Sequence, residues 1–122
     1  MNTLGQHLLL ECEGVDAQRL ADPVALEAVL YAAAAAAGAQ ALFGHCHHFG
    51  EQQGVTGVLL LRESHLSIHT WPEYGYAAID VFMCGNARPE LAADLLVSHL
   101  QPQQQRRRVL ARGLSAALPL TG

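Results

Sequence analysis

The sequence of 122 residues contains no lysine, and its seven basic residues are all arginine. Enzymes that hold a carbonyl substrate or pyridoxal phosphate as an imine need a lysine amine, and a P-loop also needs its lysine. These two kinds of chemistry are therefore excluded. Charged residues make up only 15% of the chain and hydrophobic residues 51%, which excludes a disordered protein. The length predicts one domain spanning residues 1–122.

The scarcity of basic residues, cysteines and long apolar stretches limits which partners the protein can bind and in which compartment it can function. The net charge of −4 argues against a nucleic-acid partner, which usually requires clustered basic residues. Three cysteines form no disulfide framework, as expected in a reduced, cytoplasmic protein. The N-terminus lacks the charged region of a signal peptide, and the weakly polar stretch 25–39 is too short to span a bilayer. We expect no membrane partner.

The pattern of apolar runs and breakers predicts an α+β fold. Asp22 and Pro23 are typical of a helix start, and Gly38 is typical of a helix end. The expected order is strand, helix, several hairpin-linked strands, helix and a last strand, which favours an antiparallel sheet with two helices on one face. A second copy of the chain is the expected cover for the other face. The predicted strands are 7–13, 39–49, 55–61, 64–71, 76–84 and 107–111, and the predicted helices are 23–38 and 89–100.

The segment from Glu63 to Glu73 concentrates side chains suited to catalysis. It holds two serines, two histidines and two glutamates between apolar strands, and these are nucleophile, base and acid types. If residues 72–75 form a hairpin loop, Trp71 pairs with Tyr76, and Cys84 then lies opposite Glu63. The thiol of Cys84 is therefore predicted to lie beside the Glu63–Ser64 peptide bond.

The same geometry separates His69 from Ser64. The two residues lie five positions apart on one strand, which corresponds to about 16 Å. His69 therefore cannot reach Ser64 of its own chain unless the strand bends sharply, whereas a symmetric partner can bring its own His69 there. The spacing is a hint of an active site shared between two chains.

The residues from Glu63 to Gly85 closely resemble the signature of the short class of prokaryotic S-adenosylmethionine decarboxylase proenzymes, and the segment from Gly54 to Gly57 also fits. The resemblance begins at Leu4 and covers roughly nine-tenths of the chain. It implies a pyruvoyl-dependent carboxy-lyase of spermidine biosynthesis that cleaves itself between Glu63 and Ser64. The products would be a β chain, residues 1–63, and an α chain, residues 64–122, which begins with a pyruvoyl group made from Ser64.

The resemblance also implies a role for each matching residue. His69 would assist self-cleavage, and Cys84 would return a proton to the α-carbon of the substrate. Glu73 would hold the ribose hydroxyls, and Phe49 would stack on adenine. The family fold implies a four-stranded antiparallel sheet with two helices, paired into an αββα sandwich dimer. Its active sites lie at the interface, with His, Glu and Phe coming from the partner. The substrate amine would form a Schiff base with the pyruvoyl ketone.

Some positions depart from the family pattern. Thr56 stands where serine is common, at a position linked to self-cleavage; because it keeps a hydroxyl, we expect slower cleavage at worst. The loop 50–53 and the segment after Gly85 also differ. These loops leave open a pyruvoyl-dependent ornithine or arginine decarboxylase. The Thr56 change leaves open an unprocessed, inactive homologue that acts as a partner subunit.

Several conspicuous residues have plainer interpretations. Strand alternation sends His45 and His47 to one face and Cys46 to the other, so we expect no metal site there. Cys12 and Cys46 are expected to be packing residues. The run 106–108 of three arginines is expected to be solvated or to lie on a strand edge.

Overall fold

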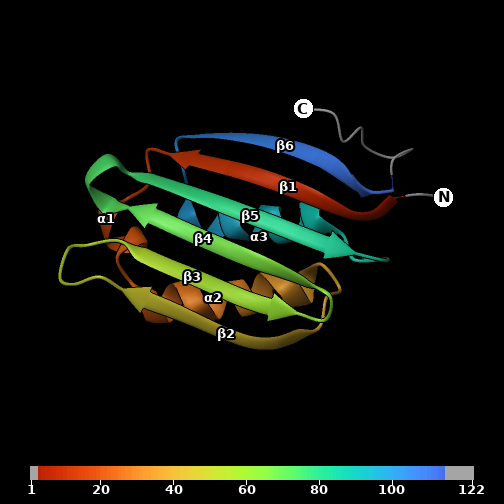
Figure 1. Cartoon of the computed structure of the whole chain (residues 1–122). Helices are drawn as coiled ribbons and strands as arrows, with labels where there is room; N and C mark the ends of the chain where they lie inside the picture. The colour runs from red at the N-terminus through yellow and green to blue at the C-terminus, as the bar shows by residue number, and fades with distance from the viewer. Residues whose placement is uncertain (1–2, 115–122) are drawn as a thin grey trace.

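A six-stranded sheet forms the centre of the molecule in the computed structural model, which describes residues 3–114. The strand order is β2-β3-β4-β5-β1-β6, and every neighbouring pair is antiparallel (Figure 1). The strands are β1 (Thr3–Glu13), β2 (Ala41–His48), β3 (Val55–Leu61), β4 (Ser64–Trp71), β5 (Tyr76–Cys84) and β6 (Gln104–Gly113). The helices are α1 (Ala17–Leu20), α2 (Pro23–Ala36), the short 3-10 helix η1 (Pro72–Tyr74) and α3 (Pro89–Leu100).

The predicted α+β fold is confirmed, with three differences in detail. The bounds of β3, β4, β5 and α3 are those predicted, whereas β1 and β6 are longer. The short helix α1 was not predicted; it begins after Asp16, whose side chain accepts the backbone N–H of Gln18. The expectation of a four-stranded sheet is wrong, because β2 pairs outside β3 and β6 pairs outside β1.

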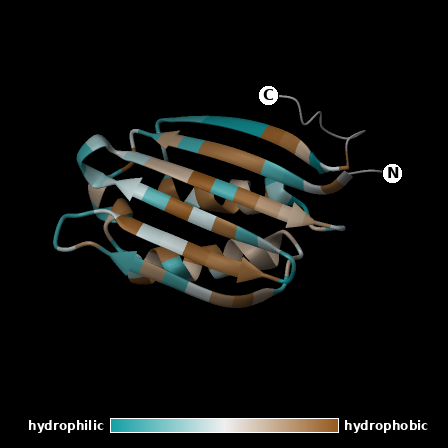
Figure 2. Ribbon diagram, viewed as in Figure 1, coloured by the Kyte–Doolittle hydropathy of each residue, from teal (hydrophilic) through white to brown (hydrophobic). Residues whose placement is uncertain are grey.

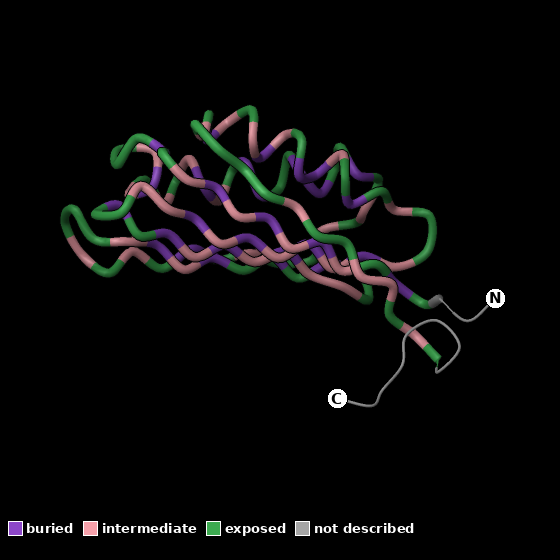
Figure 3. Tube along the Cα trace, turned by 90° about the horizontal axis from the view of Figure 1, so that it is seen from above, coloured by how far each residue is buried: buried purple, intermediate pink, exposed green. Residues whose placement is uncertain are grey.

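The helices α2 and α3 cover one face of the sheet (Figure 3). The side chain of Asp22 accepts the backbone N–H of Ala25 at the start of α2, with Pro23 in the first turn, as predicted. Small side chains let the two helices pack closely against the sheet, and Ala33, Ala34, Ala92 and Ala93 are fully buried. Within residues 3–114, none of the helices is long and apolar enough to cross a membrane.

No described part of the chain covers the opposite face of the sheet, which we call the open face (Figure 3). In a single chain, strand β3 is buried on one face only, although most of its residues are apolar. Val58 and Leu60, which lie on the open face, are 37% and 47% exposed. Figure 2 shows the hydrophobic positions of β3 in this view. Phe43 of β2 and Trp71 of β4 add exposed aromatic surface.

A buried hydroxyl joins the sheet to α1 at one end. Thr70 is only 6% exposed, and its Oγ1 accepts the backbone N–H of Val55 at 2.8 Å and donates to the carbonyl of Leu20 at 2.6 Å. Three elements therefore depend on one side chain for their buried polar groups.

We expect Thr70→Val to lower the free energy of unfolding by about 1–3 kcal/mol, because it leaves a buried N–H and a buried carbonyl without partners. Urea titration followed by circular dichroism measures the change. Thr70→Ser keeps the hydroxyl and is the matched control, for which we expect a smaller loss. Equal losses in the two variants would contradict this account.

Candidate active site

The Glu63–Ser64 bond lies at a tight turn between β3 and β4. Leu61 pairs with Ser64, so that Arg62 and Glu63 alone connect the two strands. Glu63 has a φ of 70°, in the left-handed region that costs a residue with a side chain about 1–2 kcal/mol. Glu63 is exposed and Ser64 is half-buried. The predicted cleavage site is therefore a strained and accessible peptide unit.

The thiol of Cys84 contacts this peptide unit directly. Its Sγ donates to the carbonyl oxygen of Glu63 at 3.4 Å. The register predicted for β4 and β5 is confirmed, because Trp71 pairs with Tyr76. Gly5 lies opposite Cys84 on β1, and a Cβ atom there would lie 3.2 Å from Sγ. Because residue 5 is glycine, the thiol of Cys84 has room beside β1. Its hydrogen bond polarises the carbonyl of Glu63, which a nucleophile would attack.

The other two cysteines lie in the core. Cys12 and Cys46 are buried, as predicted, and desolvation by burial raises the pKa of each thiol to about 11. Such thiols stay protonated at neutral pH and are inert. Cys84 is only partly buried. Of the three cysteines, Cys84 therefore has the most accessible thiol.

A second group of predicted residues lies at the other end of the open face. Thr56 and His69 are directly opposite each other on β3 and β4, and Thr56 Oγ1 lies 3.2 Å from His69 Nδ1. The departure from the family pattern at residue 56 thus affects the orientation of the imidazole, and the retained hydroxyl supplies the contact. Both side chains are half-buried.

The predicted substrate-binding residues lie close to this second group. Phe49 follows β2, is 60% exposed, and packs its ring 4.7 Å from that of His47. Glu73 is exposed in η1, directly after the strand that carries His69, and it lines a pocket of about 460 Å³ with residues of α1 and with Gln52. No charged partner of Glu73 is found among the described residues.

The single chain therefore divides the predicted site between two ends of the sheet. Glu63, Ser64 and Cys84 lie together at one end. His69 lies five residues along β4 from Ser64, or about 16 Å in a regular strand. The ladder of β4 is continuous from His65 to Trp71, so no sharp bend brings His69 to Ser64.

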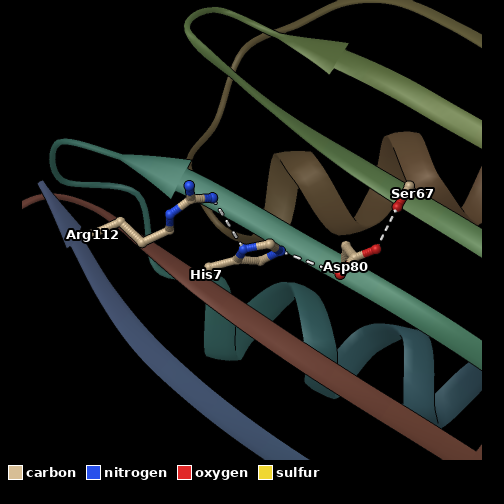
Figure 4. Close-up of polar contacts among 4 residues, drawn as sticks. All are labelled: His7, Ser67, Asp80 and Arg112. Carbon is tan, nitrogen blue, oxygen red and sulfur yellow. Dashed lines mark hydrogen bonds and ion pairs between the residues drawn. The ribbon is translucent and has the colours of Figure 1, made fainter. Parts of the chain in front are cut away.

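A polar network in the middle of the open face was not predicted (Figure 4). Asp80 of β5 accepts a hydrogen bond from Ser67 Oγ at 3.0 Å and lies 3.2 Å from His7 Nε2. Arg112 Nη1 reaches His7 Nδ1 at 3.5 Å. Ser67 and His65 both lie on this face. The sequence places these polar residues at alternating positions, but only the strand order brings β1, β5 and β6 together.

The two other polar runs are the arginines at 106–108 and the histidine-rich segment 45–48. Arg106 and Arg107 lie in the edge strand β6 and pair with Glu13 and Asp94. Among residues 3–114, no group of three or more histidine, cysteine, aspartate or glutamate side chains has the arrangement of a metal site. In the run 45–48, Cys46 is buried and its neighbours His45 and His47 are exposed on the other face.

Comparison with known proteins gives one consistent family. A family model described as S-adenosylmethionine decarboxylase matches residues 6–113. An S-adenosylmethionine decarboxylase proenzyme of Methanococcus maripaludis is 44% identical over 93% of each chain. One of Parasynechococcus marenigrum is 47% identical over 94% of this chain and 90% of its own. The crystal structure of the adenosylmethionine decarboxylase from Aquifex aeolicus has a TM-score of 0.83 and 37% identity, covering 93% of this chain and 94% of that one.

The strain at Glu63 can be measured as stability. In a Ser64→Ala background, which keeps the chain in one piece, we expect Glu63→Gly to raise the free energy of unfolding by about 0.5–1 kcal/mol, because glycine adopts positive φ without steric cost. Arg62→Gly is the control: Arg62 is not among the residues with positive φ, so this change only adds freedom to the unfolded chain and lowers stability. If both variants lose stability, Glu63 is not strained.

Proposed function

This chain belongs to the S-adenosylmethionine decarboxylase family, and on that premise we propose that it cleaves itself between Glu63 and Ser64 and then decarboxylates S-adenosylmethionine. The observation that carries the cleavage site is the contact of the Cys84 thiol with the carbonyl oxygen of Glu63, at a turn in which Glu63 has positive φ. The product of decarboxylation carries the aminopropyl group for spermidine biosynthesis.

We propose that self-cleavage starts with attack of Ser64 Oγ on the carbonyl carbon of Glu63. The new C–O bond forms as the C–N bond of the peptide breaks, and the freed amine of Ser64 takes up the hydroxyl proton. The Cys84 thiol stabilises the negative charge that develops on the carbonyl oxygen. Loss of the α-proton of Ser64 to the partner's His69 then expels the Glu63 carboxylate and leaves dehydroalanine. Water hydrolyses the imine tautomer of dehydroalanine to the pyruvoyl ketone and releases the nitrogen of residue 64 as ammonia.

The residues around Ser64 fit the pyruvoyl group that this reaction leaves. Ser64 is half-buried at the start of β4, next to a partly exposed thiol, so that a small substrate can reach it. When present, the group supplies a ketone that condenses with the amine of the substrate and accepts electrons as carbon dioxide leaves. The Cys84 Sγ–H is the proton donor to the α-carbon of the substrate.

We propose that the adenosine part of the substrate binds at Phe49 and Glu73. The exposed ring of Phe49 offers a stacking surface for adenine and for the positive sulfonium. The Glu73 carboxylate accepts hydrogen bonds from the ribose hydroxyls. The relatives reported above are all adenosylmethionine decarboxylases, which favours this substrate over ornithine or arginine.

We propose that the active unit is a dimer of cleaved chains whose open faces pack together as an αββα sandwich. Each chain places Ser64 and Cys84 at one end of the face and His69, Glu73 and Phe49 toward the other. A two-fold axis that reverses the strands lays each end on the opposite end of the partner. The exposed side chains of Val58, Leu60 and Phe43 also favour burial of this face. Residues 1–122 act as one domain, and we place it in the cytoplasm.

Replacement of the nucleophile tests the proposed activity. We expect the wild-type chain to yield fragments 1–63 and 64–122 by mass spectrometry and to release carbon dioxide from S-adenosylmethionine. Ser64→Ala should stay intact at about the full 13.1 kDa and release none. Parallel assays with ornithine and arginine test the alternative substrates. Fragments that persist in Ser64→Ala would contradict the assignment, and a wild-type chain that stays intact would favour an inactive homologue.

A mixed dimer tests the shared site. We expect His69→Ala alone and Ser64→Ala alone to remain uncleaved. When they are co-expressed with different tags, the His69→Ala chain should be cleaved, because the Ser64→Ala partner supplies an intact His69. Gel electrophoresis of each tagged chain measures the result. Cleavage of homodimeric His69→Ala at the wild-type rate, or no rescue in the mixed dimer, would contradict a site built from two chains.

A further inference from the structure

Two arginines on the open face, Arg108 and Arg112, lack an acidic partner among the described residues, and Arg112 is the one held by a polar network. Arg112 lies in the edge strand β6, with its guanidinium carbon 5.2 Å from the centre of the Phe82 ring and its Nη1 near His7 Nδ1. His7 Nε2 in turn lies 3.2 Å from Asp80, so the nearest carboxylate is one residue removed from Arg112. Within residues 3–114, no carboxylate lies within ion-pair distance of Arg112.

The network holds this guanidinium in place. Ser67, Asp80 and His7 contact one another across β4, β5 and β1 (Figure 4). The ring of Phe82 packs against the guanidinium of Arg112. A positioned cation without a counter-charge is tolerable in water, but burial without an anion is costly. If the open face is covered, the cover must supply an acidic group opposite Arg112.

The same face carries acidic groups at its other end. Glu11 and Glu13 lie on β1 opposite Arg106 and Gln104 of β6. Arg106 contacts Glu13 through Oε2, and Glu13 Oε1 makes no hydrogen bond to any of the described residues. Tyr76 donates its hydroxyl to Glu11. One end of the β1–β6 pair therefore offers a guanidinium, and the opposite end offers a free carboxylate oxygen.

The geometry of the shared site determines which ends meet. An axis that brings His69 of one chain to Ser64 of the other lies between the sheets and runs across the strands. Rotation about it reverses each strand but keeps β1 over β1 and β6 over β6 of the partner. Gly5 of β1 pairs with Arg112 of β6. Gly5 and Glu13 lie equally far from Leu9 along β1, on opposite sides of it. The midpoint between Ser64 and His69 on β4 lies between Leu66 and Ser67, and the strand registers carry this level to a point between Leu8 and Leu9 on β1. An axis at this level, next to Leu9, brings Arg112 close to Glu13 of the other copy.

We infer that Arg112 of each chain binds Glu13 of a second copy, giving two equivalent ion pairs that fix how the open faces pack. This inference rests on the shared-site dimer of the proposed function and adds the contact that sets its register. A two-fold interface requires a surface that complements itself, and opposite charges at the two ends of one face meet that requirement. Arg108, which pairs with Leu9, lies at the axis and meets only its own copy.

Charge reversal with a matched control tests the inference. We expect Arg112→Glu to raise the dissociation constant of the dimer at least about tenfold at low salt, and less at high salt, because it places two carboxylates together. Arg108→Glu changes the same residue type on the same strand and face, but it exchanges one like-charge pair for another and should leave the dimer unchanged. Sedimentation over a dilution series measures both.

Mixing complementary variants gives the sharper result. In a mixture of Arg112→Glu and Glu13→Arg chains, the mixed dimer has two opposite-charge contacts and each homodimer has none. Native mass spectrometry should therefore show more mixed dimer than random pairing gives. Because Arg106 lies beside Glu13, a double-mutant cycle of Arg112→Gln and Glu13→Gln repeats the test without added charge, and the two losses should not add.

The outcomes separate this inference from the proposed function. Suppose that the wild-type chain is an active dimer, but Arg112→Glu and Arg108→Glu dimerise equally well, the mixture pairs at random, and the losses of dimer stability in the double-mutant cycle add. The ion pair is then refuted, whereas the shared site stands. If the wild-type chain is fully active as a monomer, both are refuted. Thermal unfolding of each variant shows that any weakening is not a loss of fold.

Discussion

The one-sided cover of the sheet is the constraint on which the rest of the structure depends. Helices α2 and α3 cover one face, with leucines and alanines that have no exposed surface. The other face carries valine, leucine and aromatic side chains beside ordered polar groups, a mixture that a solvated surface does not need. The proposed self-association, the proposed division of the site and Arg112 all have this face in common.

The local geometry at Glu63 and Cys84 has a different origin from that of the distant pair Thr56 and His69. The first depends on a turn that connects two strands with only two residues, so the strain lies at the proposed cleavage site. The second depends on cross-strand pairing in a regular ladder, which orients the imidazole. A rigid ladder keeps these groups apart in one chain, and the proposed dimer is the arrangement that brings them together.

The sequence predicts the β4–β5 hairpin well because Pro72 and Gly75 mark the turn and because buried apolar residues alternate along both strands. It therefore also predicts that Cys84 lies beside Glu63. The helix α1 was missed because four residues carry no periodic signal. The network of His7, Asp80 and Arg112 was missed for another reason: these residues are far apart in the sequence, and the position of β1 between β5 and β6 is a matter of topology.

The strand order has a consequence for the proposed cleavage. Strands β1, β2 and β3 precede the Glu63–Ser64 bond and β4, β5 and β6 follow it, yet β1 lies between β5 and β6, and β3 lies beside β4. The two parts of the chain are interleaved, so a cut at the hairpin tip would leave every ladder in place. A chain cut there would be a pair of complementing peptides, whose unfolding releases two chains and whose reassembly depends on concentration.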